Sequence, residues 1–276
     1  MTSIEGRKLE ARQFSPLLDS LKADYRNAWS IGPLTQKLSR FVARNLPIRT
    51  VTMRNTMPMV SFTFDDVPTS ACEIGASTLE RFNVHGTFYV SGGGCGAIGP
   101  CGPLATADQI RALSKRGHEI GCHTYSHPAV SQLTPDELRD DVDRNQRFLS
   151  EIGSDIAVRN FAYPYGDVSW GAKRHLAGRY DSCRTIAPGV NADVIDAAML
   201  KSFMLDDESI NRSIIESLIA ETVRRHGWLI FGSHDVGEYP SPYGVSPRLL
   251  EFAVSAAQAQ GCRAVTIAEG LSLANG

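Results

Sequence analysis

Two adjacent carboxylates, Asp65 and Asp66, end a run of alternating apolar residues that begins at Val60. The aromatic and β-branched residues of this run are typical of a buried strand. An ionised acid in the middle of such a strand would be costly to desolvate, so the two acids mark the end of the strand. Successive side chains of an extended segment point in opposite directions, and we therefore expect one aspartate to bind a metal ion and the other to transfer protons. The alternative, which this run alone favours, is one aspartate that caps the next helix and one that is solvated.

A second candidate group is the pair His123 and His127, which are four residues apart. A helical or tightly turned segment would direct both imidazoles towards one metal ion. With seven histidines in the chain, a chance pair that caps a turn is an equally good interpretation. No glutamate follows His123, which excludes the HExxH pattern of zinc proteases. Asp66 would complete a set of two histidines and one carboxylate that leaves positions open for water and substrate.

Two further segments place polar groups where strands are expected to end. Pro164, Tyr165 and Gly166 turn the chain after a strand at 159–163, where backbone amides are free to point into a site. His234 follows the apolar run 228–231, and its alternative is a histidine packed in the core. In parallel α/β folds the carboxyl ends of the strands form the functional face.

From about Met57 onwards, apolar strands alternate with helical segments, and these elements must position the candidate residues. Such alternation is typical of a parallel sheet or barrel. Strands are predicted at 60–64, 86–90, 118–122, 159–163, 182–185, 228–231 and 263–267. Helices are predicted from Thr106 to Gly117, from Thr134 to Gly153, from about Glu208 to Arg225 and from Ser246 to Gly261.

The 276 residues are enough for one α/β domain with an extension. We predict a basic helical arm over 1–56 and a catalytic domain over 57–276. Ser15 and Pro16 are typical of a helix start, and Pro33 opens a second helical segment that ends before Pro47. The basic side of this arm suggests peripheral contact with an anionic membrane or a protein partner; the alternative is that the arm packs on the main domain.

Charge and cysteine content exclude several classes. The net charge is −2, and the acidic main body argues against nucleic acid as a partner. The first twenty residues contain no apolar run, so no secretory signal or membrane span is expected, and we predict a cytoplasmic protein. Six cysteines lack a CxxC pair, which favours free thiols, although Cys95 and Cys101 could close a small disulfide loop.

Taken together and in this order, the motifs resemble those of carbohydrate esterase family 4, the polysaccharide deacetylases or NodB-homology proteins. The similarity covers about residues 57–276. The TFDD motif of the family corresponds to Thr63–Asp66 and the H-[ST]-x-x-H motif to His123–His127. The third and last motifs resemble Phe161–Gly166 and Leu229–Asp235.

The resemblance implies a distorted (β/α) barrel with about seven strands. It also implies a divalent metal ion, Zn before Co, Ni or Mn, held by Asp66, His123 and His127, with Asp65 as base and His234 as acid. The expected reaction is the removal of an acetyl or similar small acyl group from an N-acetylated sugar in an oligo- or polysaccharide.

The chemistry is consistent with that reaction. Zinc can lower the pKa of its water to about 7, and Asp65 would accept the remaining proton. The backbone amide of Tyr165 would donate to the oxyanion, while His234 protonates the leaving amine. Tyr163, Pro164 and Tyr165 are the expected substrate-binding residues.

The Phe-Ala-Tyr-Pro-Tyr-Gly form of the third motif, Phe161–Gly166, resembles a branch of the family. Three departures from the family pattern therefore suggest an altered substrate rather than inactivity. Ala162 stands where the family has an arginine that holds the base, and Arg184 and Lys201 are candidates to replace it on charge alone. Gly232 stands where a leucine lines the acetyl pocket, which predicts a wider pocket. The aspartate and tryptophan of the family's fourth motif have no clear counterpart: Asp206 and Asp207 are candidates to orient the acid, His234, but no tryptophan lies near them in the sequence.

Two rival functions remain at this point. One is an amidohydrolase of a small non-sugar amide, because relatives with the same barrel resemble such enzymes. The other is a saccharide-binding protein that has lost catalysis. The intact set of candidate residues argues against a pure binder, which gains nothing from an adjacent base and acid.

Overall fold

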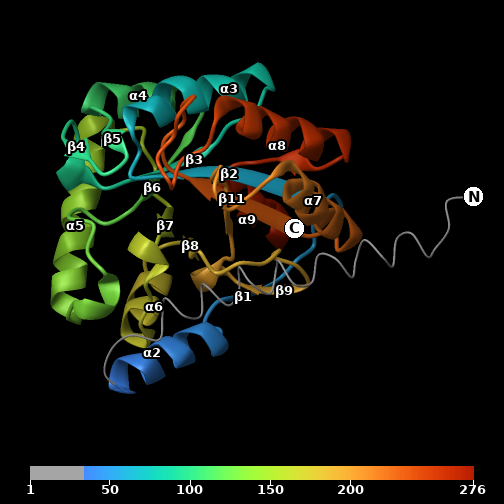
Figure 1. Cartoon of the computed structure of the whole chain (residues 1–276). Coiled ribbons are helices and arrows are strands. Elements are labelled where there is room, and N and C mark those ends of the chain that lie inside the picture. Colours follow the sequence, from blue (N-terminus) through green and yellow to red (C-terminus); the bar gives the residue numbers. More distant parts are fainter. Residues whose placement is uncertain (1–33) are drawn as a thin grey trace, which may run out of the picture.

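Strand β2 (Met59–Asp65) lies near the middle of a curled parallel sheet in the computed structural model, which describes residues 34–276 (Figure 1). The sheet order is β10 (Phe203–Met204), β11 (Trp228–Ser233), β2, β3 (Thr87–Val90), β6 (Glu119–Cys122), β7 (Asn160–Ala162) and β8 (Ser182–Arg184). A short strand, β12 (Arg263–Ala264), also pairs with β2. A bridge between Arg184 and Leu200 extends the curl beyond β8. The predicted distorted (β/α) barrel with about seven strands is confirmed.

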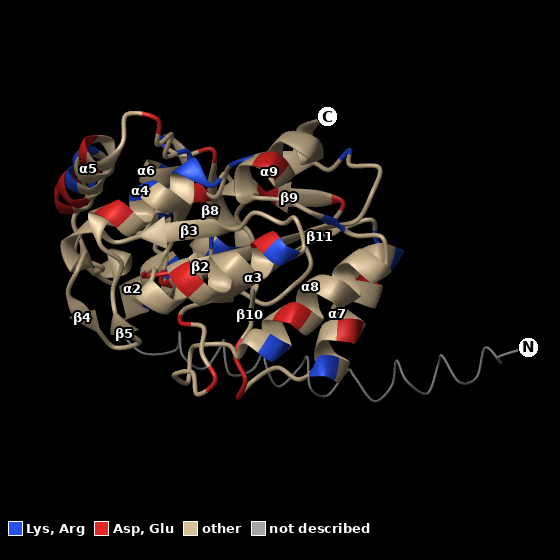
Figure 2. Ribbon diagram, turned by 90° about the horizontal axis from the view of Figure 1, so that it is seen from above, with Lys and Arg blue, Asp and Glu red and all other residues tan. Residues whose placement is uncertain are grey.

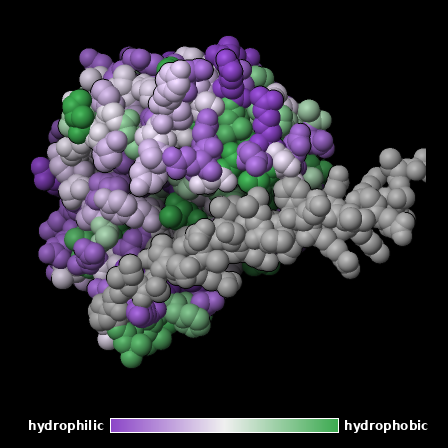
Figure 3. All heavy atoms as spheres, viewed as in Figure 1, coloured by the Kyte–Doolittle hydropathy of each residue, from purple (hydrophilic) through white to green (hydrophobic). Residues whose placement is uncertain are grey.

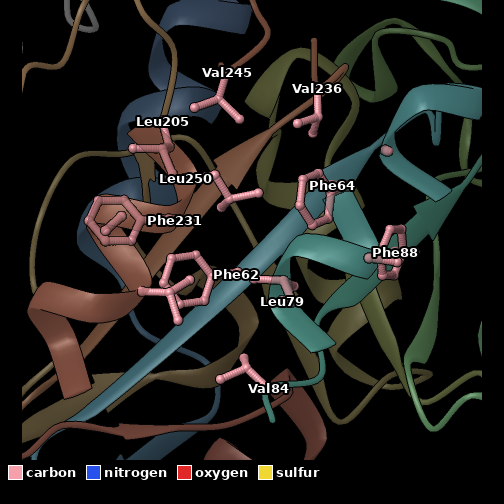
Figure 4. Close-up of a cluster of buried hydrophobic side chains, with 14 of the residues drawn as sticks. Phe62, Phe64, Leu79, Val84, Phe88, Leu205, Phe231, Val236, Val245 and Leu250 are labelled. Atoms are coloured by element: carbon pink, nitrogen blue, oxygen red, sulfur yellow. The ribbon is translucent and has the colours of Figure 1, made fainter. Parts of the chain in front are cut away.

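Successive side chains of β2 point to opposite faces of the sheet, and the two sets pack in different surroundings. Phe62 and Phe64 point towards the covering helices, where they meet Leu79, Phe88 and Phe231 in a buried cluster (Figure 4). Full burial of each such side chain contributes about 1.5–3 kcal/mol. The intervening residues of β2 face the interior of the curled sheet, and Asp65 is the last of them. The same alternation that buries the phenylalanines of β2 on one face therefore directs the Asp65 side chain into the barrel.

Seven helices of the described chain that follow β2 surround the sheet, with α3, α4 and α8 along one side of it (Figure 1). Acidic and basic residues are interspersed along outer helices such as α5, α7 and α8 (Figure 2). The helices are α3 (Ala76–Arg81), α4 (Ala107–Lys115), α5 (Pro135–Ile152), α6 (Trp170–Ala177), α7 (Arg212–Arg224), α8 (Pro247–Ala259) and α9 (Ile267–Asn275).

Capping chemistry explains where the helices begin. Capping boxes are present at Thr106 and Thr134, where two of the helices were predicted to begin. Helix α7 begins at Arg212, not near Glu208, because Asn211 is its N-cap and accepts the amide of Ile214.

The prediction for the end of the chain is wrong. The strand predicted over 263–267 stops at Ala264, and Thr266 starts helix α9. A third capping box, formed by Thr266 and Glu269, was the sequence signal for this helix. Helix α6, strand β10 and two antiparallel pairs were also not predicted. The pairs are β1 (Thr50–Thr52) with β9 (Val194–Asp196) and β4 (Ile98–Gly99) with β5 (Gly102–Pro103).

The described part of the N-terminal arm contains helix α2 (Leu34–Asn45), which packs on α6, and strand β1, which pairs with β9. The Lys173 ammonium of α6 donates hydrogen bonds to the carbonyls of Ala43 and Leu46, at 2.6 and 2.8 Å. The helix predicted from Ser15 lies outside the described residues. In residues 34–56, the alternative that the arm packs on the main domain therefore holds. The boundary at 57 stays a prediction.

The outer side of α2 is apolar. Leu34 is 82% exposed, and Leu38 and Phe41 are more than half exposed; hydrophobic atoms gather at this helix in Figure 3. Contact of the arm with a membrane or a partner stays a prediction. No helix within residues 34–276 is long and apolar enough to cross a bilayer.

Candidate functional site

The carboxyl ends of the strands surround a cavity of about 1150 Å³. Its lining contains six of the predicted site residues, which come from the ends of four strands and the turns after them. They are Asp65, Asp66, His123, His127, Tyr165 and His234. Residues that lie up to 169 positions apart in the chain thus meet at one face of the sheet, as the parallel topology requires.

Asp66, His123 and His127 form a compact cluster of metal-ligand type. Their potential ligand atoms all lie within 4.8 Å of one another. The Oδ1 atom of Asp66 is 3.3 Å from Nε2 of His127 and 3.9 Å from Nε2 of His123. On its other side, His123 Nδ1 is 2.8 Å from the carbonyl oxygen of Ala162, which fixes the proton on Nδ1 and leaves Nε2 for a ligand. The donor set fits a divalent ion.

The backbone around this cluster is held in an unusual conformation. Asp66, His127 and Tyr165 have φ values of 57°, 54° and 58°, in the left-handed region, and so does the β-branched Val67 at 54°. Such conformations cost about 1–3 kcal/mol each and persist where the surroundings impose them, often at functional sites. The two histidines therefore converge through a strained turn, not through the helix that their spacing also allowed.

Burial keeps His127 of this cluster neutral. Its pKa falls to about 4, first because burial disfavours the charged form and then because His123 is close. A neutral imidazole has a lone pair free for a metal ion at neutral pH, so the site does not need to lose a proton from His127 before it binds one.

Asp65 has a different environment from its neighbour Asp66. Its side chain is buried and forms an ion pair with Arg184, whose Nη2 contacts both carboxylate oxygens. Burial alone would raise the pKa of Asp65, but Arg184, followed by His123 and His234, lowers it below its ordinary value. The carboxylate is thus kept ionised inside the barrel and can accept a proton.

Of the two candidates to hold Asp65, the structure brings Arg184 to it and not Lys201, whose side chain is exposed. A Cβ atom at Gly232 would lie 3.2 Å from the Met204 sulfur and 3.5 Å from Arg184 Nη1, so these two side chains border the position. The wider pocket that the small size of Gly232 suggested stays a prediction.

His234 lines the cavity, and its Nδ1 is 3.3 Å from the carbonyl oxygen of Tyr243. The two aspartates proposed to orient it have other partners. Asp206 accepts the amide of Ser209, and Asp207 accepts the amide of Ser246. A backbone carbonyl thus takes the orienting position, for which the sequence carries no residue signal.

The turn after β7 separates the three predicted substrate-binding residues. Tyr165 lines the cavity, and its ring packs edge-on against His127 with centroids 4.5 Å apart. Tyr163 is buried, and its hydroxyl donates to the Ala198 carbonyl at 3.1 Å. Pro164 is also buried. The structure therefore brings only Tyr165 to the cavity.

The two cysteines of the glycine-rich loop are free thiols. Cys101 lines the cavity, a position that its distance from the ligands in the sequence did not suggest. Burial raises the pKa of both Cys95 and Cys101, so neither is a ready thiolate ligand or nucleophile at neutral pH.

We expect the double variant Cys95→Ser/Cys101→Ser to keep turnover within about threefold, because serine preserves size and neither thiol is ionised. Metal content, melting temperature and turnover of the double variant would be compared with those of Cys262→Ser, which changes a buried cysteine outside the cavity lining. A collapse of turnover in a folded, metal-loaded double variant would contradict this prediction.

Comparison with known proteins supports the motif-based resemblance. Residues 53–177 match the family model described as polysaccharide deacetylase. The chitin deacetylase of Colletotrichum lindemuthianum is 24% identical over 234 residues, which cover 84% of this chain and 88% of that protein. Two other curated relatives, the bifunctional xylanase/deacetylase of Pseudobutyrivibrio xylanivorans and the peptidoglycan-N-acetylglucosamine deacetylase of Bacillus cereus, are 27% identical but matched over only 17% and 49% of their lengths.

Solved structures confirm the fold. The chitin deacetylase structure from Colletotrichum lindemuthianum has a TM-score of 0.56 at 20% identity and covers 79% of this chain and 89% of that one. A CE4 family pseudoenzyme from Bacillus anthracis has a TM-score of 0.55 at 16% identity and covers 82% and 70%. The fold alone is thus shared by active and inactive relatives.

Proposed function

We propose, from the premise that this chain belongs to the polysaccharide deacetylase family, that it is a metal-dependent hydrolase acting on an N-acetylated sugar in an oligo- or polysaccharide. It would remove an acetyl or similar small acyl group. The observation that carries the proposal is the division between adjacent aspartates: Asp66 faces two histidines, while Asp65 is held ionised by Arg184. This is the arrangement that metal-assisted hydrolysis needs.

Asp66, His123 and His127 would hold the metal ion, for which we propose Zn²⁺, with Co²⁺, Ni²⁺ or Mn²⁺ as alternatives. When bound, such an ion supplies a Lewis acid that polarises the acyl carbonyl and makes a nearby water molecule more acidic. The carbonyl of Ala162 keeps His123 in the tautomer that such binding requires.

Asp65 would act as general base towards the attacking water. It lines the same cavity as the metal cluster, its side chain is buried, and its charge is maintained by Arg184. A positioned base of this kind typically contributes about 10²–10⁴-fold in rate.

His234 would donate the proton that the leaving amine requires. The Tyr243 carbonyl would accept from Nδ1, so Nε2 is the nitrogen left to exchange a proton with the substrate. The amide of Tyr165 would donate to the developing oxyanion. The adjacent amides of Gly166 and Asp167 bond back to Tyr163 and Pro164, and this turn fixes the direction of the peptide.

A saccharide is the proposed substrate because exposed aromatic rings border the cavity. Tyr165 and Tyr243 are 64% and 59% exposed, and both line it. Aromatic rings with one apolar face and a polar tip suit the mixed surface of a sugar ring. Tyr163 and Pro164 would not contact the substrate themselves. They would contribute to binding indirectly, because they shape the turn that places Tyr165 in the cavity.

A substrate panel tests this proposal. We expect metal-loaded protein to release acetate from chitooligosaccharides at least about 10-fold faster than from cyclic or linear small amides, because only the saccharides reach both exposed tyrosines. Chelation should abolish turnover, and one equivalent of Zn²⁺ should restore it.

Two results would contradict the proposal. Faster turnover of a small amide would indicate an amidohydrolase of non-sugar substrates. Saccharide binding without turnover of any compound in metal-loaded protein would indicate an inactive binding relative.

A further inference from the structure

We propose that Arg184 is a positioning residue that holds Asp65 for catalysis from the opposite side of the barrel, and that this position of the guanidinium depends on the absence of a large side chain at Gly232. The inference rests on the proposed function, in which Asp65 is the base. Three observations on Arg184 support it: the strand register that places it, the burial of its side chain, and the close packing around its guanidinium.

Register places Arg184 on the interior face. In the pairing of β7 with β8, Arg184 is the partner of Ala162. The residue before each of them, Phe161 and Cys183, lies in the cluster outside the sheet. By the alternation of strands, Ala162 and Arg184 therefore both point into the barrel. The small Ala162 side chain leaves room beside it for a long one.

The Arg184 guanidinium reaches across the barrel to β2, and side chains of the interior surround it. Its centre lies 5.2 Å from the ring of Tyr89, another interior residue. Nη1 lies 3.5 Å from the Cβ position of Gly232 on β11, and Nη2 meets Asp65. A Cβ atom at 232 would be tight against the Met204 sulfur and in ordinary contact with Nη1, so we expect the further atoms of a leucine to crowd both side chains.

The fold by itself does not account for this arrangement. The Arg184 side chain is 0% exposed, and within the described residues its Nε and Nη1 atoms have no hydrogen-bond partner. A buried ion pair generally contributes little net stability compared with a well-packed apolar group, because both charges lose their hydration. A buried arginine in which only one nitrogen has a hydrogen-bond partner contributes little to stability. Its position is therefore better explained by the orientation of the Asp65 carboxylate.

The test measures kcat, KM, metal content and melting temperature of metal-loaded full-length variants on the best substrate of the panel. We expect Arg184→Met to lower kcat about 10²-fold, with KM and metal content changed less than about threefold, because a misplacement of about 1 Å can cost 10²-fold. Arg184→Lys should recover about 10-fold of this loss, since it restores the charge without the planar fork.

Two further variants separate positioning from a merely structural role. In an Asp65→Asn background, Arg184→Met should lower kcat no further, because Arg184 acts through Asp65. Gly232→Leu should lower kcat as Arg184→Met does, whereas Gly171→Ala, where an added Cβ meets nothing within 4 Å, should not.

Failure of this inference is distinct from failure of the proposed function. If the unaltered protein turns over no compound of the panel, the proposed function is wrong. If the unaltered protein is active and folded Arg184→Met keeps its kcat within about threefold, the positioning role is wrong. Equal losses of kcat from Arg184→Met with and without Asp65→Asn would also overturn it.

Discussion

Asp66→Asn is expected to lose the metal ion and turnover together. The side chain is the only carboxylate in the cluster with His123 and His127, and asparagine removes its negative charge while keeping its shape. We expect metal content to fall from about one ion per chain to a small fraction of that, and turnover to fall by at least about 10²-fold. Elemental analysis after gel filtration, followed by an acetate-release assay, measures both.

A matched control is Asp207→Asn, because asparagine can still accept the hydrogen bond from the Ser246 amide. This variant should keep both metal and turnover. A stoichiometric metal ion in Asp66→Asn, with activity close to that of the unaltered protein, would show that the ion binds elsewhere or is not needed.

The second large effect is expected for Asp65→Asn, which should keep the metal and lose most turnover. Asparagine is nearly isosteric with aspartate but cannot accept the proton from water, so the rate should fall by about 10² or more. Metal content should stay near one ion per chain, because Asp65 faces Arg184 rather than the two histidines. Metal content and turnover of Asp65→Asn and Asp66→Asn, measured after the same incubation with metal ion, would show whether one aspartate transfers the proton and the other binds the ion.

The structure adds a cost that the sequence did not suggest. Asp65→Asn leaves the buried Arg184 charge without its counter-charge, and the loss of one partner of a buried pair destabilises a protein by up to about 3–5 kcal/mol. A lower melting temperature is therefore expected. The double variant Asp65→Asn/Arg184→Met removes the unpaired charge and should regain stability without regaining activity.

Two outcomes would contradict this assignment. Equal metal loss in Asp65→Asn and Asp66→Asn would mean that both aspartates serve the ion. Nearly full activity of Asp65→Asn would mean that another group is the base, and Asp206, which lines the same cavity, would be the first to test.

Much of the fold could be predicted because its signals are local. The alternation in Val60–Phe64 and the capping boxes at Thr106 and Thr134 appear within a few residues of the elements that they define. Where predictions were wrong, another local signal had been missed, such as the capping box at Thr266 that turns the expected final strand into α9. Short elements such as β9 and β10 carry too few residues to show a period.

The sequence by itself determined which side chains stand at the ends of the strands, because period-two patterns and adjacent polar residues are properties of neighbouring positions. The candidate metal cluster Asp66, His123 and His127 was therefore predictable as a set. Tertiary structure alone decided which cation meets Asp65, that Met204 and Arg184 border Gly232, and that Cys101 lines the cavity. Asp65 and Arg184 are 119 residues apart, and they meet because the curl and register of the sheet bring β8 across from β2. No local pattern encodes that distance, since it depends on how all the intervening strands pack.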